Sequence, residues 1–463
     1  SFIFPLITFP YVSRILSPEG TGKVSFANSV IAYFALFAQL GIPTYGIRAC
    51  AKVRDNKEKL SRTVQEIFII NMVMTVITYI VFGITLVCVP RLQTERPLFL
   101  IMSTTLLFNA VGLDWLYRGL EKYTYITVRS ILFKFIALLA MFALIHQKSD
   151  YVIYGGISIF AASASNICNL VNVHRYIQIR PVRKYQFQRH LKPVMIFFAM
   201  SCATTIYTNL DTVMLGFIKT DIDVGYYNAA VKIKSVLLGI VTSLGTVLLP
   251  RASYYIEHHE MEEFRRITKK AINFVFLIAV PLTCYFILYA KEGILFLSGK
   301  EYMPAVIPMQ IIMPVVVLTG AAQVCIMQAL IPLKKDKAVL LASVIGAVTA
   351  VLFNIMFVGQ LGAIGSALVL LCSEICSDIF AFGYAIKKKV FTLPWRFIVK
   401  RIISSIPYIA ICYTTGKCLN LNNIATLFIA LLICGFYFGV EGLFVLKLPI
   451  VRDFFAEIKK QIR

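Results

Sequence analysis

Residues 67–89 read IFIINMVMTVITYIVFGITLVCV, a run of 23 residues that contains no charged side chain. As an α-helix this run would be about 34 Å long, which is enough to cross the roughly 30 Å hydrocarbon core of a bilayer. Similar runs recur along the chain, of whose 463 residues 59% are hydrophobic and only 15% are charged. This composition excludes a soluble globular domain and predicts an all-α integral membrane protein.

The hydrophobic runs predict fourteen membrane-spanning helices. Six precede residue 194, six lie between residues 194 and 386, and two follow. We expect them near 1–17, 24–44, 67–89, 97–117, 125–146, 151–173, 194–217, 225–249, 271–290, 305–331, 338–358, 362–386, 402–418 and 424–446. The first run is short and starts at Ser1 rather than Met, so we expect that native N-terminal residues are missing from this sequence.

The basic residues predict the orientation of these helices. Of the 46 Lys and Arg residues, 34 lie in alternate gaps that begin with 45–66, eight lie in the other gaps, and four lie within spans. The positive-inside rule therefore places both termini in the cytoplasm. Trp115 and Trp395, the two tryptophans, fall at the same cytoplasmic interface, where an aromatic belt is expected. The net charge of +23 thus indicates topology and contact with lipid headgroups, and we expect no nucleic-acid partner.

Signals for an enzyme are weak. The five histidines are scattered, without the spacing of metal ligands. The stretch Gly20–Lys23 departs from a phosphate-binding loop, because Val24 stands where that loop needs Ser or Thr. The gaps on the outer side are too short to hold a catalytic domain. We therefore expect a transporter without a cofactor, driven by an H⁺ or Na⁺ gradient, the membrane potential or the substrate's own gradient.

A weak internal repeat divides the predicted helices into two sets of six. Residues 14–27 (RILSPEGTGKVSFA) align with residues 214–230 (MLGFIKTDIDVGYYNAA). In each segment we expect a helix to exit outward, a short loop to turn at a glycine (Gly22 or Gly225), and the next helix to begin. The expected domains are an N-terminal lobe (1–193), a C-terminal lobe (194–386) and two further helices with a tail (387–463). Transporters built from repeats bind substrate where the repeats meet, so we expect a central cavity.

Several motifs carry a family resemblance. They are PYVSR at 10–14, YGIR at 45–48, DWLYRGLEKYTYITVRS at 114–130, NLDTVMLG at 209–216 and VGYYNAA at 224–230. With these motifs the chain resembles the polysaccharide repeat-unit flippases (Wzx type, for O-antigen or capsule) of the multidrug/oligosaccharidyl-lipid/polysaccharide exporter superfamily. The resemblance implies a MATE-like, alternating-access fold in the bacterial inner membrane. It also implies export of undecaprenyl-diphosphate-linked oligosaccharide from the cytoplasmic to the periplasmic leaflet.

Four basic residues within the predicted spans are candidates to contact an anionic headgroup: Arg14, Lys134, Lys232 and Lys234. A lysine at mid-membrane costs about 2.5–3.5 kcal/mol on insertion scales, so such residues usually face a cavity. Lys232 and Lys234 point about 200° apart on a helix, so at most one faces it squarely. Two structural alternatives stay open: Arg14 can snorkel to the headgroups, and Lys134 can pair with an acid on a neighbouring helix.

Amides and buried acids complete the predicted site. Asn28, Asn166 and Asn354 are candidates to bind sugar hydroxyls, although interhelical hydrogen bonding is the commoner role of such amides. The candidates for ion coupling are Asp211, Glu374 and Asp378, the last two lying four residues apart on one helix face. Charge pairing of these acids with Lys134, Lys232 or Lys234 is the alternative.

The predicted partner is a lipid-linked oligosaccharide, and a monomer suffices for a two-lobed carrier. Contact with other polysaccharide-assembly proteins is left open. Two other functions are weighed against the flippase. One is a cation-coupled multidrug exporter of the same fold, for which a more acidic cavity is expected. The other is a membrane-embedded polysaccharide polymerase, which the short outer loops disfavour.

Overall fold

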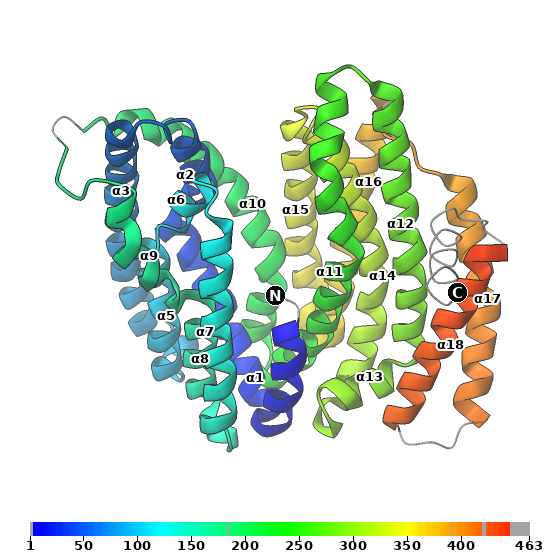
Figure 1. The fold of residues 1–463 in the computed structure, drawn as a ribbon. Helices are drawn as coiled ribbons and strands as arrows, with labels where there is room; N and C mark the ends of the chain where they lie inside the picture. Colours follow the sequence, from blue (N-terminus) through cyan, green and yellow to red (C-terminus); the bar gives the residue numbers. More distant parts are fainter. Residues whose placement is uncertain (1–2, 183–184, 389, 419–422, 445–463) are drawn as a thin grey trace, which may run out of the picture. The chain divides into compact units, whose positions relative to one another are not determined.

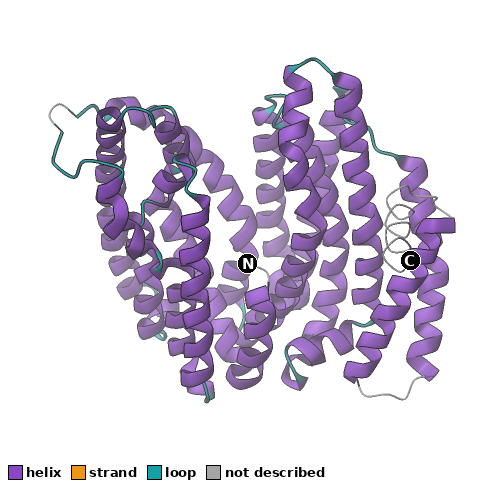
Figure 2. Ribbon diagram, in the orientation of Figure 1, coloured by secondary structure: helices purple, strands orange, loops and turns teal. Residues whose placement is uncertain are grey.

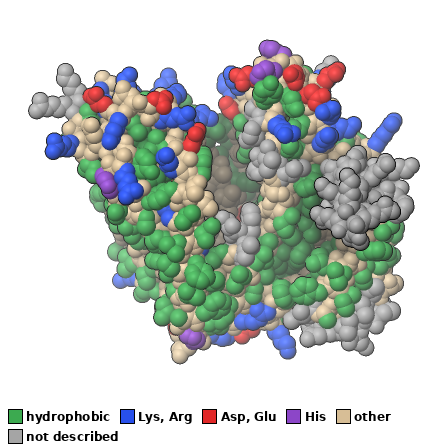
Figure 3. All heavy atoms as spheres, viewed as in Figure 1, with side chains coloured by type: hydrophobic (Ala, Val, Ile, Leu, Met, Phe, Trp, Pro, Cys, Tyr) green, Lys and Arg blue, Asp and Glu red, His purple; other side chains and the backbone are tan. Residues whose placement is uncertain are grey.

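The computed structural model describes residues 3–182, 185–388, 390–418 and 423–444, and every regular element in these ranges is a helix (Figures 1 and 2). Ten helical segments are long and apolar enough to cross a membrane, and two shorter apolar helices cover Arg96–Val111 and Ala425–Glu441. Hydrophobic side chains cover the lengths of the helices, whereas charged side chains gather near their ends (Figure 3). The prediction of an all-α, multi-pass membrane protein is confirmed.

The chain forms two compact units, each with its own set of internal contacts. Of the described residues, unit 1 comprises those in 3–228 and 350–366, and unit 2 comprises those in 229–349 and 367–444. Helices α11, α15 and α16 therefore contribute residues to both units. The three domains predicted from the repeat have different boundaries, and they stay a prediction.

Unit 1 holds the first ten α-helices of the chain. They are α1 (Ile3–Gln39), α2 (Ile42–Ala51), α3 (Lys57–Cys88), α4 (Pro90–Gln93), α5 (Arg96–Val111), α6 (Asp114–Gly119), α7 (Tyr123–Leu144), α8 (Tyr151–Ile159), α9 (Asn166–Asn172) and α10 (Gln188–Ile218). A π-helical turn at Phe160–Ala164 joins α8 to α9, and short 3₁₀ turns lie at Lys148–Asp150 and Val173–Arg175.

The remaining α-helices are α11 (Asp221–Glu257), α12 (Met261–Leu288), α13 (Ala290–Leu297), α14 (Val306–Gln323), α15 (Asp336–Leu361), α16 (Ala363–Lys387), α17 (Trp395–Cys418) and α18 (Asn423–Phe444). A 3₁₀ segment at Lys300–Ala305 precedes α14, and a π-helical segment at Val324–Leu330 continues it. Within unit 2, α12 packs against α14, α17 and α18.

The first two predicted spans are continuous in α1, apart from one residue. Ser17 has φ 61° and ψ 176°, which breaks the helix immediately before Pro18. A residue that precedes proline is disfavoured in the α region, so the break falls where the sequence predicts one. The loop expected at 18–23 is nevertheless wrong, because residues 18–23 are helical. The change of direction between the two parts of α1 is made by Ser17 alone.

Gly22 and Gly225, which we expected to make turns, instead lie inside α1 and α11 where these helices cross. A Cβ on Gly22 would overlap the carbonyl oxygen of Asp221, and a Cβ on Gly225 would overlap that of Pro18. Arg91 reinforces the contact: its Nη2 pairs with Asp221, and its Nε donates to the Gly216 carbonyl at 3.0 Å. The two glycines therefore match because they permit one backbone-to-backbone contact between two helices.

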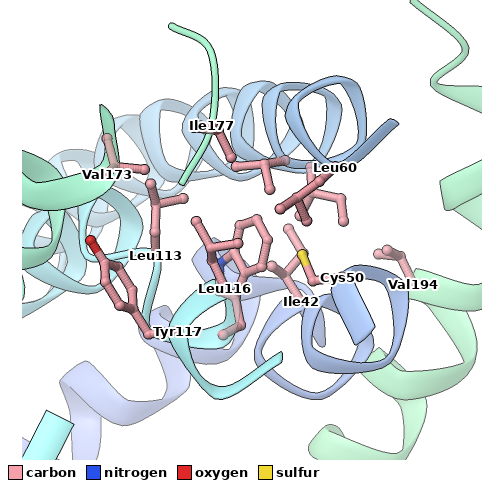
Figure 4. Close-up of a cluster of buried hydrophobic side chains, with 12 residues drawn as sticks. Ile42, Cys50, Leu60, Leu113, Leu116, Tyr117, Val173, Ile177 and Val194 are labelled. Carbon is pink, nitrogen blue, oxygen red and sulfur yellow. The ribbon is translucent and has the colours of Figure 1, made fainter. Parts of the chain in front are cut away.

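The core at one end of unit 1 gathers side chains from α2, α3, α6 and α10 (Figure 4). Trp115 belongs to this core and is only 4% exposed. Its ring lies against Gly46, where an added Cβ would sit 2.6 Å from it. The expected role of Trp115 in an aromatic belt is therefore wrong, whereas Trp395 is 62% exposed, as a belt residue should be. Leu113, with φ 46°, turns the chain so that the next residues start a new helix, α6.

A buried ion pair connects α17 and α18, the last two helices of unit 2. Arg401 in α17 has no exposed surface and pairs with Glu441 in α18, which also accepts a hydrogen bond from Ser404. The Arg401 Nη2 donates to the Leu277 carbonyl of α12 at 2.8 Å. The guanidinium also lies 4.4 Å from the centre of the Phe438 ring. One side chain thus connects three helices.

The helix crossing at Gly225 gives a direct prediction. Gly225→Ala should lower the thermal unfolding temperature of the purified protein in detergent, because overpacking typically costs about 1–3 kcal/mol. Gly83→Ala is the matched control, since nothing lies within 4 Å of its added Cβ and alanine favours a helix by up to about 1 kcal/mol. Equal unfolding temperatures for Gly225→Ala and the native chain would contradict the crossing.

The buried pair gives a second prediction. Glu441→Gln should destabilise the protein strongly, because removing one partner of a buried pair costs about 3–5 kcal/mol. The double variant Arg401→Met/Glu441→Gln should recover part of that loss, since no unpaired charge is then buried. Thermal unfolding of the three proteins in one detergent measures both effects. A double variant less stable than Glu441→Gln alone would show that packing, not charge, dominates at this site.

Candidate functional site

Unit 1 encloses a polar pocket of about 450 Å³, a volume within the usual range for ligand sites. The end of α1, the segments α2, α3, α5, α6 and α7, and the π-turn with the start of α9 contribute its walls. The polar side chains that line it are Gln39, Thr44, Asn71, Asn109, Asp114, Trp115, Arg118, Arg129, Ser130, Ser165 and Asn166. An amide-rich, charged cavity among apolar helices is the main functional candidate in the described residues of this unit.

Local backbone geometry creates the pocket. Helix α5 ends at Val111, and α6 begins at Asp114 after the left-handed turn at Leu113. Gly112 stands against Asn166, whose Cγ would lie 2.6 Å from an added Cβ. A larger residue at 112 would therefore displace the Asn166 side chain, so the glycine lets α9 approach the end of α5.

Arg129 is the central charge of the pocket. It is only 7% exposed, and its Nη2 lies 2.6 Å from Asp114 Oδ1. Its Nη1 donates to Ser165 Oγ and to Asn166 Oδ1, each at 3.1 Å. Arg129 Nε is buried without a hydrogen-bond partner in the described structure. The guanidinium is thus held firmly in position while it keeps one unused donor.

A single carboxylate, that of Asp114, pairs with two guanidinium groups in this pocket. Asp114 Oδ2 accepts from Arg118 Nε at 2.6 Å, while Asp114 Oδ1 accepts from Arg129. Arg118 is about half exposed and the Asp114 side chain is 30% exposed. The three charges sum to +1, so an anion that enters the pocket meets an excess of positive charge and a guanidinium fork suited to phosphate.

Amide and indole groups surround these charges. Asn166 Nδ2 donates to Asn109 Oδ1 at 3.3 Å, and Asn71 Nδ2 donates to the Ala110 carbonyl at 3.4 Å. Asn71 Oδ1 and Trp115 Nε1 are buried without hydrogen-bond partners in the described structure. The amide side chains that line the pocket carry both donors and acceptors, which suits ligands with many hydroxyl groups.

The predicted basic residues do not line this pocket. Lys134 is half-buried on α7, one turn beyond Ser130, and Arg14 is exposed with its Nη1 2.7 Å from the Pro10 carbonyl. Lys232 is exposed and Lys234 is half-buried, both on the part of α11 that belongs to unit 2. The roles assigned to these four residues stay predictions.

The predicted amides separate into three environments. Asn166 lies in the pocket, while Asn28 is exposed on α1. Asn354 is fully buried on α15 and donates to Asp211 Oδ1 at 2.8 Å. Tyr227 donates to the other oxygen of Asp211 at 3.1 Å. Asn354 is thus engaged with a predicted coupling acid.

The other two predicted coupling acids lie in unit 2. Glu374 and Asp378 are each 5% exposed on α16. Glu374 accepts a hydrogen bond from Thr319 of α14, and Asp378 Oδ2 is buried without a hydrogen-bond partner in the described structure. In the described part of the chain neither acid forms a salt bridge with Lys134, Lys232 or Lys234, which was the alternative for this pair.

Sequence reasoning missed Arg129 as a site residue. This arginine lies at the edge of a predicted span and counts with the cytoplasmic charges, and the sequence favours a structural role for Asp114 and Arg118 as a pair four residues apart near the cytoplasmic interface. The pair exists, but α7 brings Arg129 against it. One signal was present: Asp114, Arg118 and Arg129 all fall in the quoted motif at 114–130.

Comparisons with known proteins agree with this architecture. The family model described as "Polysaccharide biosynthesis protein" matches residues 1–256, and the model named MatE matches residues 197–356. The chain is 26% identical over 376 residues to a protein of Escherichia coli K12 named "Putative O-antigen transporter", covering 81% of this chain and 90% of the relative.

Two solved structures share the fold. A lipid II flippase, MurJ, in an inward closed conformation, gives a TM-score of 0.70 at 16% identity over 100% of both chains. An inward-facing multidrug resistance transporter of the MATE family gives a TM-score of 0.64 at 13% identity, covering 83% of this chain and 94% of that one. The family match covers more than half of the sequence. The chain therefore belongs to the polysaccharide biosynthesis family, a family of membrane transporters and flippases rather than enzymes, and it shares its fold with a MATE-family exporter.

Proposed function

We propose that this protein moves polyprenyl-diphosphate-linked oligosaccharide units, of the O-antigen or capsule type, from the cytoplasmic to the periplasmic leaflet of the bacterial inner membrane. The observation that carries the proposal is the unit 1 pocket, which combines an excess of positive charge with a lining of amide side chains. The similarity to a protein named as an O-antigen transporter supports the same substrate class.

The pocket suits the head of such a substrate. A diphosphate carries about two negative charges, and the planar guanidinium forks of Arg118 and Arg129 match phosphate oxygens. Sugars offer hydroxyl groups to Asn71, Asn109 and Asn166. The isoprenoid tail stays in lipid throughout, so only the head needs a polar path.

Topology and energetics complete the proposal. Fourteen spans with both termini in the cytoplasm follow from the hydrophobic runs and the distribution of basic residues. Export of two negative charges from an inside-negative cell releases roughly 4.6 kcal/mol per 100 mV. Asp211, with its partners Asn354 and Tyr227, is the candidate for H⁺ or Na⁺ coupling in unit 1, and Glu374 with Asp378 is the candidate in unit 2.

A cation-coupled multidrug exporter is the second candidate, because the MatE family model matches residues 197–356. Its cationic substrates would be repelled by the pocket, where one carboxylate faces two guanidinium groups. Complementation separates the two functions: a strain that lacks its own O-antigen flippase should regain surface polysaccharide when it makes this protein. Restored dye efflux without polysaccharide would favour the exporter instead.

Substitution of Arg129 tests the pocket in the same strain. Arg129→Gln combined with Asp114→Asn removes the buried guanidinium together with its partly exposed carboxylate partner. No unpaired charge is then buried, and Arg118 keeps the net charge of the pocket at +1, so the variant tests the Arg129 contact itself. We expect surface polysaccharide to fall at least about tenfold, because one charge-assisted contact contributes about 1.5–3 kcal/mol. Exposed Arg175, changed to Gln, is the control and should stay active. Normal polysaccharide in the double variant, at equal protein abundance, would exclude the pocket as the head-binding site.

Lys134 allows a separate test of the predicted cationic path. Its side chain forms no ion pair in the described structure, so Lys134→Ala should leave protein abundance and unfolding temperature unchanged. We expect export to be abolished if the ammonium group contacts the substrate. Immunoblotting and surface polysaccharide, measured together, distinguish lost transport from lost protein. A fully active Lys134→Ala strain would remove this residue from the path.

A further inference from the structure

A second cavity lies in unit 2, along a groove that α17 and α18 form. Its volume is about 890 Å³, and its walls run from Trp395 to Pro407 on α17. These positions span twelve helical steps, or about 18 Å, which is close to one leaflet of a roughly 30 Å hydrocarbon core. The groove therefore has the length of a single phospholipid acyl chain.

The groove is amphiphilic along its length. Its middle is apolar and accessible, with Val399 and Ile403 50% and 58% exposed. At its Trp395 end stand Arg396 and Lys400, which are exposed and one helical turn apart. The acid that also lines this cavity, Glu441, is engaged by Arg401 and Ser404. Arg396 and Lys400 therefore lie on one face of a helix, one turn apart, beside an interfacial tryptophan.

We propose that this groove binds one anionic phospholipid of the cytoplasmic leaflet. The phosphate lies between Arg396 and Lys400, and an acyl chain follows Val399, Ile403 and Pro407. Each basic residue near the cytoplasmic surface of a membrane gains about 1 kcal/mol from anionic headgroups. This proposal goes beyond the proposed transport function and does not depend on it.

Two other occupants fit the groove less well. The chain's own residues 445–463 carry five Lys and Arg against two Asp and Glu, so their charge does not complement Arg396 and Lys400. The polyprenyl tail of a lipid-linked sugar is longer than one leaflet, whereas the groove ends after about 18 Å. A phospholipid satisfies both the charge and the length.

Native mass spectrometry of the full chain, released from nanodiscs, tests the proposal. Nanodiscs of phosphatidylglycerol with phosphatidylcholine should leave one phosphatidylglycerol bound, and pure phosphatidylcholine should leave none. Arg396→Ala/Lys400→Ala should weaken retention roughly 10- to 30-fold, since each basic residue near the surface contributes about 1 kcal/mol. Ile403→Trp keeps both charges and fills the groove, so it should weaken retention as well. Arg175→Ala/Lys192→Ala removes two exposed charges elsewhere and should retain the lipid.

The outcomes separate the possible occupants. Equal loss in the control double variant would show diffuse attraction to the protein's net charge and would overturn the proposal. Displacement of phosphatidylglycerol by an equimolar polyprenyl diphosphate would assign the groove to the transport substrate instead. Retention that survives both Arg396→Ala/Lys400→Ala and Ile403→Trp, in protein with an unchanged unfolding temperature, would place the lipid elsewhere.

Discussion

The contact between Arg129 and Asp114 is the constraint on which the functional part of unit 1 depends. A guanidinium that is only 7% exposed among membrane helices needs a partner for its charge and hydrogen bonds for most of its donors. Asp114, Ser165 and Asn166 supply these from α6, from the residue after the π-turn and from α9. The hydrogen bonds of Arg129 therefore hold α6, the π-turn and α9 close to α7, and the pocket lies between these elements.

Two buried arginines show how similar chemistry can serve different ends. Arg401 is sealed among three helices, has no exposed surface, and pairs with Glu441 as part of the packing. Arg129 lines a cavity of about 450 Å³, where the shared carboxylate leaves a net positive charge. Buried ion pairs by themselves are weak evidence for either stability or function. Access to a cavity, not burial, makes Arg129 the candidate for ligand contact.

Three glycines also have roles that depend on their surroundings in the folded protein. Gly22 and Gly225 were predicted as turns because the two aligned segments, 14–27 and 214–230, each place a glycine between two apolar runs, yet both lie within helices. Their shared property is the absence of a Cβ, which lets α1 and α11 touch through their backbones. Trp115 was expected at the lipid surface, but the turn at Leu113 directs it against Gly46. Sequence position alone cannot tell a turn from a close crossing, since both require glycine.

The sequence by itself determined the all-helical, multi-pass architecture. Apolar runs that span a bilayer must hydrogen-bond their own backbone N–H and C=O groups, and an α-helix does this within a single segment. It also indicated the family, through motifs spread along the chain. Only the tertiary structure brought Arg129 to Asp114, placed Asn354 on Asp211 and buried Glu374 beside Thr319. Hydrophobic periodicity reports which residues avoid water, whereas these contacts depend on how helices distant in sequence meet side by side.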